Sequence, residues 1–331
     1  MSMQAPLPKH NPREVNKRFF KPLRRLIKMN YFRFKVRGAN HIPSQGPTIF
    51  VANHSGWVAI DALFMMMAIH DTAGPEFLPY IIVHDMLLKV PLVSDLLKDL
   101  GTIPADLLHY GREPLPPELN PIAIFPEGAD GNSKPFWKAY HMQPWKTGFV
   151  RLAIQRRAQV VPVTIIGGEE SVPVAQTLDA FKPLLGSVAP LPVSLMPLPS
   201  RWKIEFLEPL DFSTYDPALI HSKEACREIA DQVFNLVQTR LEMAAKRNPL
   251  LWLSNMLDRE QEGEDEKPET QTPSPSQSDS QNHSQNSGES QAPEEPEAES
   301  PPKTEAKTGH RASAKEVSKP GFDLSYDDNI D

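Results

Sequence analysis

Two side chains that could transfer a proton lie close together in the chain, His54 and Asp61, within the segment NHSGWVAID at 53–61. Histidine has an ordinary pKa of about 6.5, so its neutral imidazole can accept a proton from a hydroxyl group at neutral pH. A carboxylate that binds the second ring nitrogen fixes the tautomer and stabilises the imidazolium. The alternative is a loop histidine followed by an aspartate that caps a helix. The pair therefore predicts either a catalytic base with its orienting carboxylate or an ordinary capped helix.

The residues around this pair predict a strand, a turn and a helix. The β-branched run 48–52 indicates a short buried strand, and 62–69 indicates a helix. Further strands are expected at 32–38, 80–83, 101–105, 121–125, 159–167 and 201–210, and helices at 86–100, 145–157 and 223–247. Strands that alternate with helices are typical of an α/β domain with a mostly parallel sheet flanked by helices. Because ligands bind outside the carboxyl ends of such strands, His54 and Glu127, which both follow a strand, are expected to converge.

The N-terminal segment 1–31 is basic and amphipathic. Between residues 9 and 37 there are eleven Lys or Arg residues and a single acid, Glu14. Apolar residues recur among them at helical spacing, which is typical of a helix that lies on an anionic membrane surface. Such a segment could also bind nucleic acid phosphates, or be a solvated helix that covers the domain. No run of 18 apolar residues occurs, so we expect a protein that lies on a membrane without spanning it.

Charge and composition change near the C-terminus. Residues 261–331 hold 17 acidic and 6 basic residues, a net charge of −11, whereas residues 1–260 have a net charge of +4. From residue 258 onward Pro, Ser, Gln and Glu dominate, which predicts a disordered tail. The apolar, proline-rich segment 181–200 is expected to be a loop that packs on the core or dips into lipid. The single cysteine, Cys226, excludes an intrachain disulfide, and no histidine spacing favours a metal site.

Four short motifs occur in a fixed order. They are NHSGWVAID at 53–61, GTIPA at 101–105, FPEG at 125–128 followed by WKTGF at 145–149, and VVPVTIIG at 160–167. Together they resemble the lysophospholipid acyltransferase family, which includes 1-acylglycerol-3-phosphate acyltransferase. The resemblance covers about residues 32–210. It implies one acyltransferase-like domain at 32–257, preceded by the amphipathic segment 1–31 and followed by the tail 258–331.

The resemblance also implies roles for individual residues. His54 matches the catalytic base and Asp61 its partner, Glu127 and Gly128 match the part that binds the acyl acceptor, and Pro162 matches the part on the acyl-donor side. The supporting motif residues are Asn53, Gly101, Phe125, Pro126 and Pro162. The implied reaction moves a fatty acyl group from acyl-CoA or acyl carrier protein to a hydroxyl of a lysophospholipid or related glycerolipid. It uses no cofactor, metal or nucleic acid, and it takes place at the cytoplasmic face of a membrane.

Three departures from the family pattern leave alternatives open. Six residues separate His54 from Asp61, where the family usually has four. The arginine expected soon after the second motif has only Arg112 as its candidate. After FPEG, Ala-Asp-Gly replaces the usual Thr-Arg-Ser, so Lys146 and Arg151 are candidate substitutes, or simply the solvated face of a helix. The acceptor could instead be a neutral or amino-acid lipid, or the chain could be a non-catalytic lipid-binding protein. Acyl-chain length, the donor and the oligomeric state stay undetermined.

Overall fold

The computed structural model describes residues 11–56, 60–85, 88, 93–108, 115–178 and 189–245. All of these residues lie within one compact unit, residues 1–269. The expected tail at 258–331, the end of the expected domain at 246–257, residues 181–188 and Arg112 lie outside the described part.

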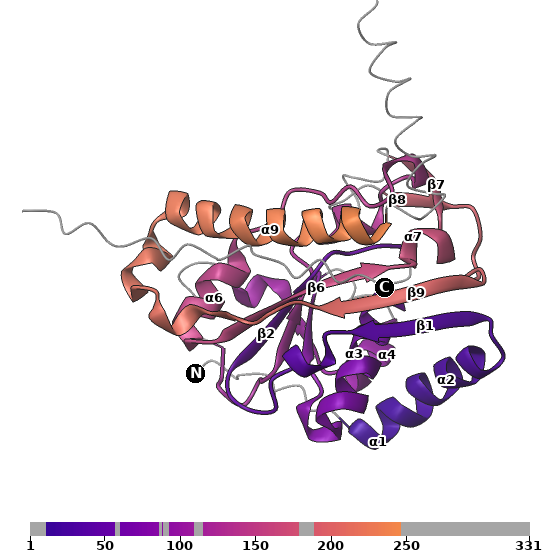
Figure 1. Ribbon diagram of the computed structural model, residues 1–331, viewed down its shortest axis with the longest axis horizontal. Coiled ribbons are helices and arrows are strands. Elements are labelled where there is room, and N and C mark those ends of the chain that lie inside the picture. Colours follow the sequence, from indigo (N-terminus) through magenta and orange to yellow (C-terminus); the bar gives the residue numbers. More distant parts are fainter. Residues whose placement is uncertain are drawn as a thin grey trace, which may run out of the picture. The chain divides into compact units, whose positions relative to one another are not determined.

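The described part is built on a twisted sheet whose strands run in the order β1-β9-β6-β2-β5-β3-β4 (Figure 1). Pairing is parallel along β6-β2-β5-β3-β4 and between β1 and β9. Within the described part of this sheet, only the β6–β9 and β6–β10 pairs are antiparallel. The expected α/β fold with a mostly parallel sheet is therefore confirmed. The strands are β1 Phe32–Arg37, β2 Thr48–Ala52, β3 Tyr80–Val83, β4 Thr102–Pro104, β5 Ile122–Ile124, β6 Gln159–Ile166, β9 Ser200–Phe206 and β10 Leu210–Asp211.

Helices cover both faces of the sheet. In Figure 1, α9 lies above the sheet, and α3, α4 and the N-terminal helices lie below it. A separate hairpin of two strands, β7 and β8, precedes β9. The helices are α1 Pro12–Val15, a π-helical turn Asn16–Phe20, α2 Lys21–Lys28, α3 Ile60–Ala73, α4 Val93–Asp99, α5 Ala129–Asn132, α6 Gly148–Arg156, α7 Gly168–Ser171 and α9 Lys223–Ala245, and the hairpin strands are β7 Val174–Leu178 and β8 Ala189–Pro192. Single-turn 3₁₀ helices occupy Ala39–His41, Pro75–Phe77, Ala105–Leu108, Phe136–Lys138, Phe212–Thr214 and Pro217–His221.

Strand β2 lies at the centre of the sheet and is buried along its whole length. Successive side chains of a strand point to opposite faces. Ile49 and Val51 accordingly join the hydrophobic cluster that contains residues of α6 and α9, whereas Phe50 and Ala52 join the cluster that contains residues of α3. Because both layers hold this strand, its carboxyl end is a rigid position from which to present a catalytic side chain.

The N-terminal segment covers the domain with its apolar face. Val15, Phe20 and Leu23 are buried in the same cluster as the residues of α3. The exposed side of the segment is basic, and the described ion pairs along it are those of Lys17, Arg18 and Arg24. The sequence pattern left a membrane anchor, a nucleic-acid contact and a covering helix as alternatives. The apolar residues of this segment pack against the core, as those of a covering helix do, and the membrane association of the segment stays a prediction.

Candidate active site

His54 and Asp61 contact each other at the carboxyl end of β2. The His54 Nδ1 atom lies 2.7 Å from Oδ2 of Asp61. The same carboxylate oxygen accepts the backbone N–H of Ser55 at 2.9 Å, and Oδ1 accepts the N–H of Ala62 at 2.8 Å. Asp61 lies in the first turn of α3 and is fully buried. The structure thus brings the two residues together across the six residues between them. Asp61 binds the ring and also accepts one backbone N–H from the loop, that of Ser55, and one from the first turn of its helix, that of Ala62.

The His54 ring is held in place on a second side by an aromatic neighbour. It stacks on Phe125, with 4.3 Å between ring centroids and 30° between ring planes. About a tenth of the His54 side chain is exposed. Because Nδ1 faces Asp61, Nε2 is the ring nitrogen left for another partner. The ring is therefore oriented by a carboxylate and an aromatic face before any substrate binds.

Asn53 extends the hydrogen bonding of the sheet past the end of β2. Its side-chain Nδ2 donates to the carbonyl of Ile165 at 2.9 Å, and its Oδ1 accepts the N–H of Ile165 at 2.7 Å. A side-chain amide carries one donor group and one acceptor, like the backbone of a paired strand. The Asn53 side chain can therefore replace the backbone hydrogen bonds of a strand residue to β6, while the main chain turns away from β6 toward His54.

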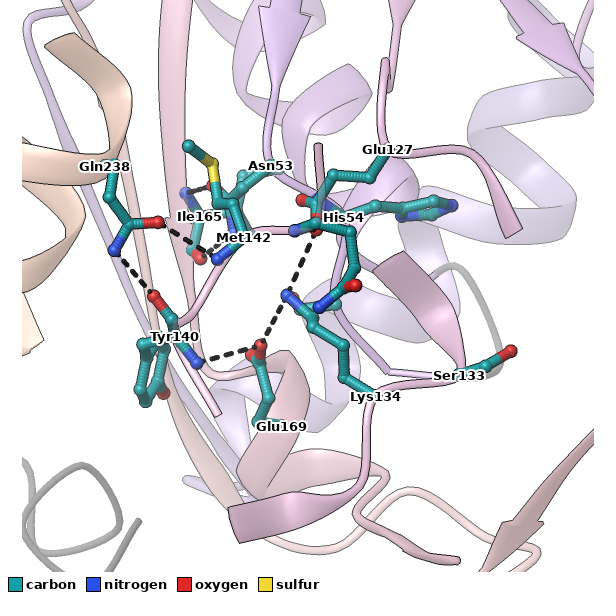
Figure 2. A network of polar contacts seen from close by, with 12 residues as sticks. Asn53, His54, Glu127, Ser133, Lys134, Tyr140, Met142, Ile165, Glu169 and Gln238 are labelled. Carbon is teal, nitrogen blue, oxygen red and sulfur yellow. Dashed lines mark hydrogen bonds and ion pairs between the residues drawn. The ribbon is translucent and has the colours of Figure 1, made fainter. Parts of the chain in front are cut away.

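The carboxylate of Glu127 is used entirely inside the protein (Figure 2). Its Oε1 accepts the backbone N–H of His54 at 2.8 Å, and its Oε2 accepts the backbone N–H of Gln143 at 2.7 Å. The Nζ atom of Lys134 lies 3.3 Å from the same Oε2. The Glu127 side chain is fully buried. With its oxygens engaged in this way, Glu127 is suited to position His54, whereas the sequence motif implied contact with the acceptor.

Lys134 connects Glu127 to a second buried carboxylate, Glu169. The distance from Lys134 Nζ to Glu169 Oε1 is 3.5 Å, and only 2 % of the Lys134 side chain is exposed. Burial opposes the charge on Lys134, but the two carboxylates raise its pKa overall. Burial raises the pKa of Glu169 to about 7, although Lys134 opposes this shift. Lys134 thus joins the carboxylate that holds His54 to a second buried acid on α7.

The same network reaches the long helix α9. Glu169 accepts the backbone N–H of Tyr140 at 3.4 Å. Gln238 of α9 donates from Nε2 to the carbonyl of Tyr140 at 3.0 Å and accepts the N–H of Met142 at 3.0 Å (Figure 2). The segment that follows the FPEG motif is thus tied to α7 and α9. Sequence reasoning missed Lys134, Glu169 and Gln238. In the case of Lys134, a lysine in a segment rich in Gly, Ser and Pro is typical of an exposed loop.

Two glycines, one at the end of the third motif and one just after it, allow close approaches. A Cβ atom on Gly131 would lie 2.9 Å from the Cβ of His54 and 2.8 Å from the Cβ of Glu127. Gly128 has a φ of +63° and a Cβ there would lie 3.1 Å from Nζ of Lys146. The exposed ammonium group of Lys146 therefore lies over Gly128, beside the residue that holds His54. Lys146 precedes α6 and does not belong to it, and its backbone N–H donates to Pro126 at 3.1 Å.

The other candidate residues Arg151, Pro162 and Gly101 make contacts or turns within the fold. Arg151 donates from Nε to the carbonyl of Ile220 and from its guanidinium NH1 to the hydroxyl of Thr147, both at 3.1 Å. Pro162 is buried in β6, where it pairs with Val51 of β2. Gly101 precedes β4 with a φ of +65°. The sequence suggested Lys146 and Arg151 as substitutes for the arginine that the third motif lacks. Lys146 lies beside this motif, whereas the described contacts of Arg151 are with Ile220 and Thr147.

Comparisons with known proteins agree with the motif order. A family model described as "Acyltransferase" matches residues 33–166, a range that contains His54, Asp61, Glu127 and Lys146. "Uncharacterized protein ML2427" of Mycobacterium leprae is 32% identical over 245 residues, covering 70% of this chain and 66% of that protein. "Uncharacterized protein Rv0502" of Mycobacterium tuberculosis is also 32% identical over 245 residues, covering 70% of this chain and 68% of its own. The chain thus spans about two thirds of the length of these relatives.

Among solved structures, the 1-acyl-sn-glycerophosphate (LPA) acyltransferase PlsC from Thermotoga maritima matches 71% of this chain and 80% of its own. The identity is 18% and the TM-score is 0.45.

Proposed function

This chain belongs to the acyltransferase family, and we propose that it moves a fatty acyl group from acyl-CoA or acyl carrier protein to a hydroxyl of a lysophospholipid or related glycerolipid. The observation that carries the proposal is the contact of 2.7 Å between His54 Nδ1 and the buried carboxylate of Asp61. This contact leaves Nε2 to act as the general base. A non-catalytic lipid-binding protein on the same fold would have no need of an oriented, partly exposed imidazole.

In the proposed reaction the acceptor hydroxyl attacks the thioester directly. Its oxygen forms a bond to the carbonyl carbon while His54 Nε2 takes the hydroxyl proton. Asp61 stabilises the imidazolium that results. The tetrahedral intermediate then expels the donor thiolate, which receives the proton from His54, so an ester and a free thiol leave. No acyl-enzyme intermediate and no nucleophilic serine or cysteine are required.

Lys146 supports an acceptor that carries a negative charge. Its ammonium group lies over Gly128, the last residue of the third motif, and the family often has an arginine shortly after that motif. An ammonium ion is a common point charge for phosphate recognition. The neutral or amino-acid lipid acceptor stays the second candidate, because Ala129-Asp130-Gly131 follows FPEG where the family often has an arginine.

We further propose that the protein works at the cytoplasmic face of a membrane, because the proposed acceptor resides in lipid. No helix in the described ranges of the chain is long and apolar enough to cross a bilayer.

A transfer assay with purified protein tests the proposal. Release of the donor thiol from acyl-CoA and acyl carrier protein is measured with lysophosphatidate, monoacylglycerol and an amino-acid lipid as acceptors. We expect the highest rate with the phosphate-bearing acceptor and no detectable transfer by His54→Ala. The matched control is His70→Ala, which removes a histidine that also contacts an aspartate, Asp71, at 2.9 Å but lies at the end of α3. Near-normal transfer by His54→Ala, or no thiol release with any acceptor, would reject the mechanism.

A further inference from the structure

Exposed apolar side chains gather in β8 and in its connection to β9. Of the eight large apolar residues that are exposed in the described part of the chain, five lie between Leu191 and Leu198. Leu195 and Met196, at the turn between β8 and β9, are 76% and 73% exposed. Large apolar side chains that are exposed together usually mark an interaction site. We call residues 191–198 together with Met29 the apolar tip.

Met29 belongs to this tip because the α2–β1 turn lies against it. The hydroxyl of Tyr31 donates to the carbonyl of Pro197 at 2.6 Å. Met29, at the end of α2, is 70% exposed. Two segments that are far apart in sequence therefore form one surface.

A row of cations lies next to the apolar tip. Strands β1 and β9 pair in a register that sets Arg33 opposite Arg201 and Lys35 opposite Lys203. Like charges directly opposite each other on neighbouring strands destabilise a sheet. Glu205 pairs with Lys203 at 3.4 Å and with Arg240 at 2.6 Å.

Arg33, Lys35 and Arg201 are exposed, and within the described part of the chain no contact with a carboxylate is recorded for them. The stretches 25–37 and 189–204 contain no acidic residue. Such a row is most favourable where an external anion covers it.

The tip and the cation row lie at the end of the sheet that carries His54. Strand β6 runs parallel to β2 and antiparallel to β9, and Ile166 at the end of β6 pairs with Lys203 near the start of β9. Val163, which pairs with Ala52 at the end of β2, pairs with Phe206 at the end of β9, so the beginnings of β9 and β1 lie beyond the carboxyl end of β2, on the same side of the sheet. In Figure 1 the β8–β9 connection and the α2–β1 turn are both at the right of the view.

We propose that the apolar tip and the row Arg33, Lys35 and Arg201 form a docking surface for an anionic lipid bilayer. The tip enters the boundary between headgroups and acyl chains, and the cations bind lipid phosphates. This inference rests on the proposed function only in that the bilayer is the source of the lipid acceptor. It places the membrane contact on residues 191–198, part of the segment 181–200 whose sequence allowed contact with lipid, and not on the apolar face of the N-terminal helices, which is buried.

Vesicle co-sedimentation of the full chain tests this surface, with phosphatidylcholine alone and with mixtures containing phosphatidylglycerol. We expect binding only to the anionic vesicles, with a loss on raising the salt concentration. Removing two cations in Arg33→Gln/Arg201→Gln should weaken binding about thirtyfold, at roughly fivefold for each cation near an anionic surface. Leu195→Ser/Met196→Ser should also lose binding.

Matched controls separate this surface from its rivals. Met243→Ser changes an exposed apolar residue on α9, and Arg13→Gln/Lys21→Gln removes two exposed cations from the N-terminal segment. Both should bind vesicles like the unchanged protein. Loss of binding in the Arg13/Lys21 variant with normal binding in the tip and row variants would overturn the proposal in favour of the helix. Normal vesicle binding with impaired transfer from acyl carrier protein in the Arg33/Arg201 variant would assign the row to an acidic protein instead.

A second measurement makes the outcome independent of the proposed chemistry. Transfer to a short-chain, water-soluble acceptor should be unchanged in the tip and row variants, because no bilayer is involved. His54→Ala should bind vesicles normally. If the unchanged protein binds vesicles through this surface but transfers no acyl group, the docking surface stands and the proposed reaction fails. If it transfers acyl groups but does not bind anionic vesicles, the docking surface fails.

Discussion

The backbone N–H of His54 donates to Oε1 of Glu127 at 2.8 Å, so the third motif holds the first one in place. The other oxygen of the same carboxylate accepts the backbone N–H of Gln143 and faces the ammonium group of Lys134. The position of the proposed catalytic histidine thus depends on a buried carboxyl group more than 70 residues further along the chain. The proposed roles of the two motifs follow from this contact, with one residue carrying the proton and the other fixing where that residue lies.

Glu127→Gln tests this positioning role. Glutamine has one acceptor oxygen and one NH2 group. The NH2 group would therefore face another donor, either the backbone N–H of His54 or the N–H of Gln143 together with Lys134. We expect the free energy of unfolding to fall by about 1–3 kcal/mol, the cost of an unsatisfied buried group. The turnover number should fall by up to about a hundredfold through misplacement of His54, with little change in KM.

The double variant Glu127→Gln/Lys134→Met supplies the control for that prediction. It removes the buried cation together with its partner, so the two changes should couple by about 0.5–3 kcal/mol in a double-mutant cycle of urea unfolding. Additive effects, together with unchanged kinetics in Glu127→Gln, would show that the contact plays no part in positioning His54.

Asp61→Asn tests the orienting carboxylate. The amide nearly matches the carboxylate in shape but favours the wrong tautomer of His54, so transfer should fall by about a thousandfold to ten-thousandfold, as for the equivalent change in serine proteases. KM for both substrates should change little, because Asp61 is buried away from them. Steady-state kinetics with far-ultraviolet circular dichroism check this result. A variant that is folded and fully active would reduce Asp61 to a helix cap.

Lys146→Gln tests the charge of the acceptor. Loss of a charge-assisted hydrogen bond should raise KM for lysophosphatidate about tenfold and leave KM for monoacylglycerol unchanged. Lys138→Gln is the matched control, since Lys138 is exposed and lies in the same segment of the chain. An equal change with both acceptors would contradict the assignment, and no change with either would favour the neutral acceptor.

Glu169 predicts a pH dependence of stability. Burial raises its pKa from 4.5 to about 7, so the folded protein binds this proton more tightly than the unfolded chain. The stabilisation from the protonated group is complete below pH 4.5 and disappears as the pH rises through 7.

Glu169→Gln should therefore gain stability relative to the unchanged protein as the pH increases from 4.5 to 7, by at most about 3 kcal/mol. Urea unfolding between pH 4 and 8 measures it, with the exposed Glu208→Gln as control. A difference that does not vary with pH would show that Glu169 does not titrate in this range.

The sequence predicted the strands of the sheet, and with them the position of His54, the proposed base, just after the carboxyl end of a strand. Apolar runs such as 48–52 specify buried strands through hydrophobicity alone, and the expected strands and the helix at 62–69 are present, except that the strand expected at 201–210 ends at Phe206. The contact between His54 and Asp61 was also foreseeable, because motif order overrode the unusual spacing. Neither inference needed knowledge of a distant contact.

The buried charges and the N-terminal helices could not be assigned from sequence. Lys134 lies between acids that are seven residues before it and 35 residues after it, and no local pattern encodes that meeting. An amphipathic pattern such as that of Phe20 and Leu23 shows that one face is apolar, but core and lipid satisfy that face equally well. Only the fold shows that the core covers it.

The side chain of Asn53 has a consequence for protein design. Its amide replaces one residue's worth of strand pairing with Ile165, so His54 can leave the sheet without exposing the edge of β6. A His–Asp pair transplanted to another parallel sheet would arrive without this closure and without the carboxylate that holds its backbone. The smallest unit to transplant therefore contains more than the His–Asp pair. It also includes the end of the strand, the Asn53 side chain that pairs with Ile165, and the neighbouring turn that contributes Glu127.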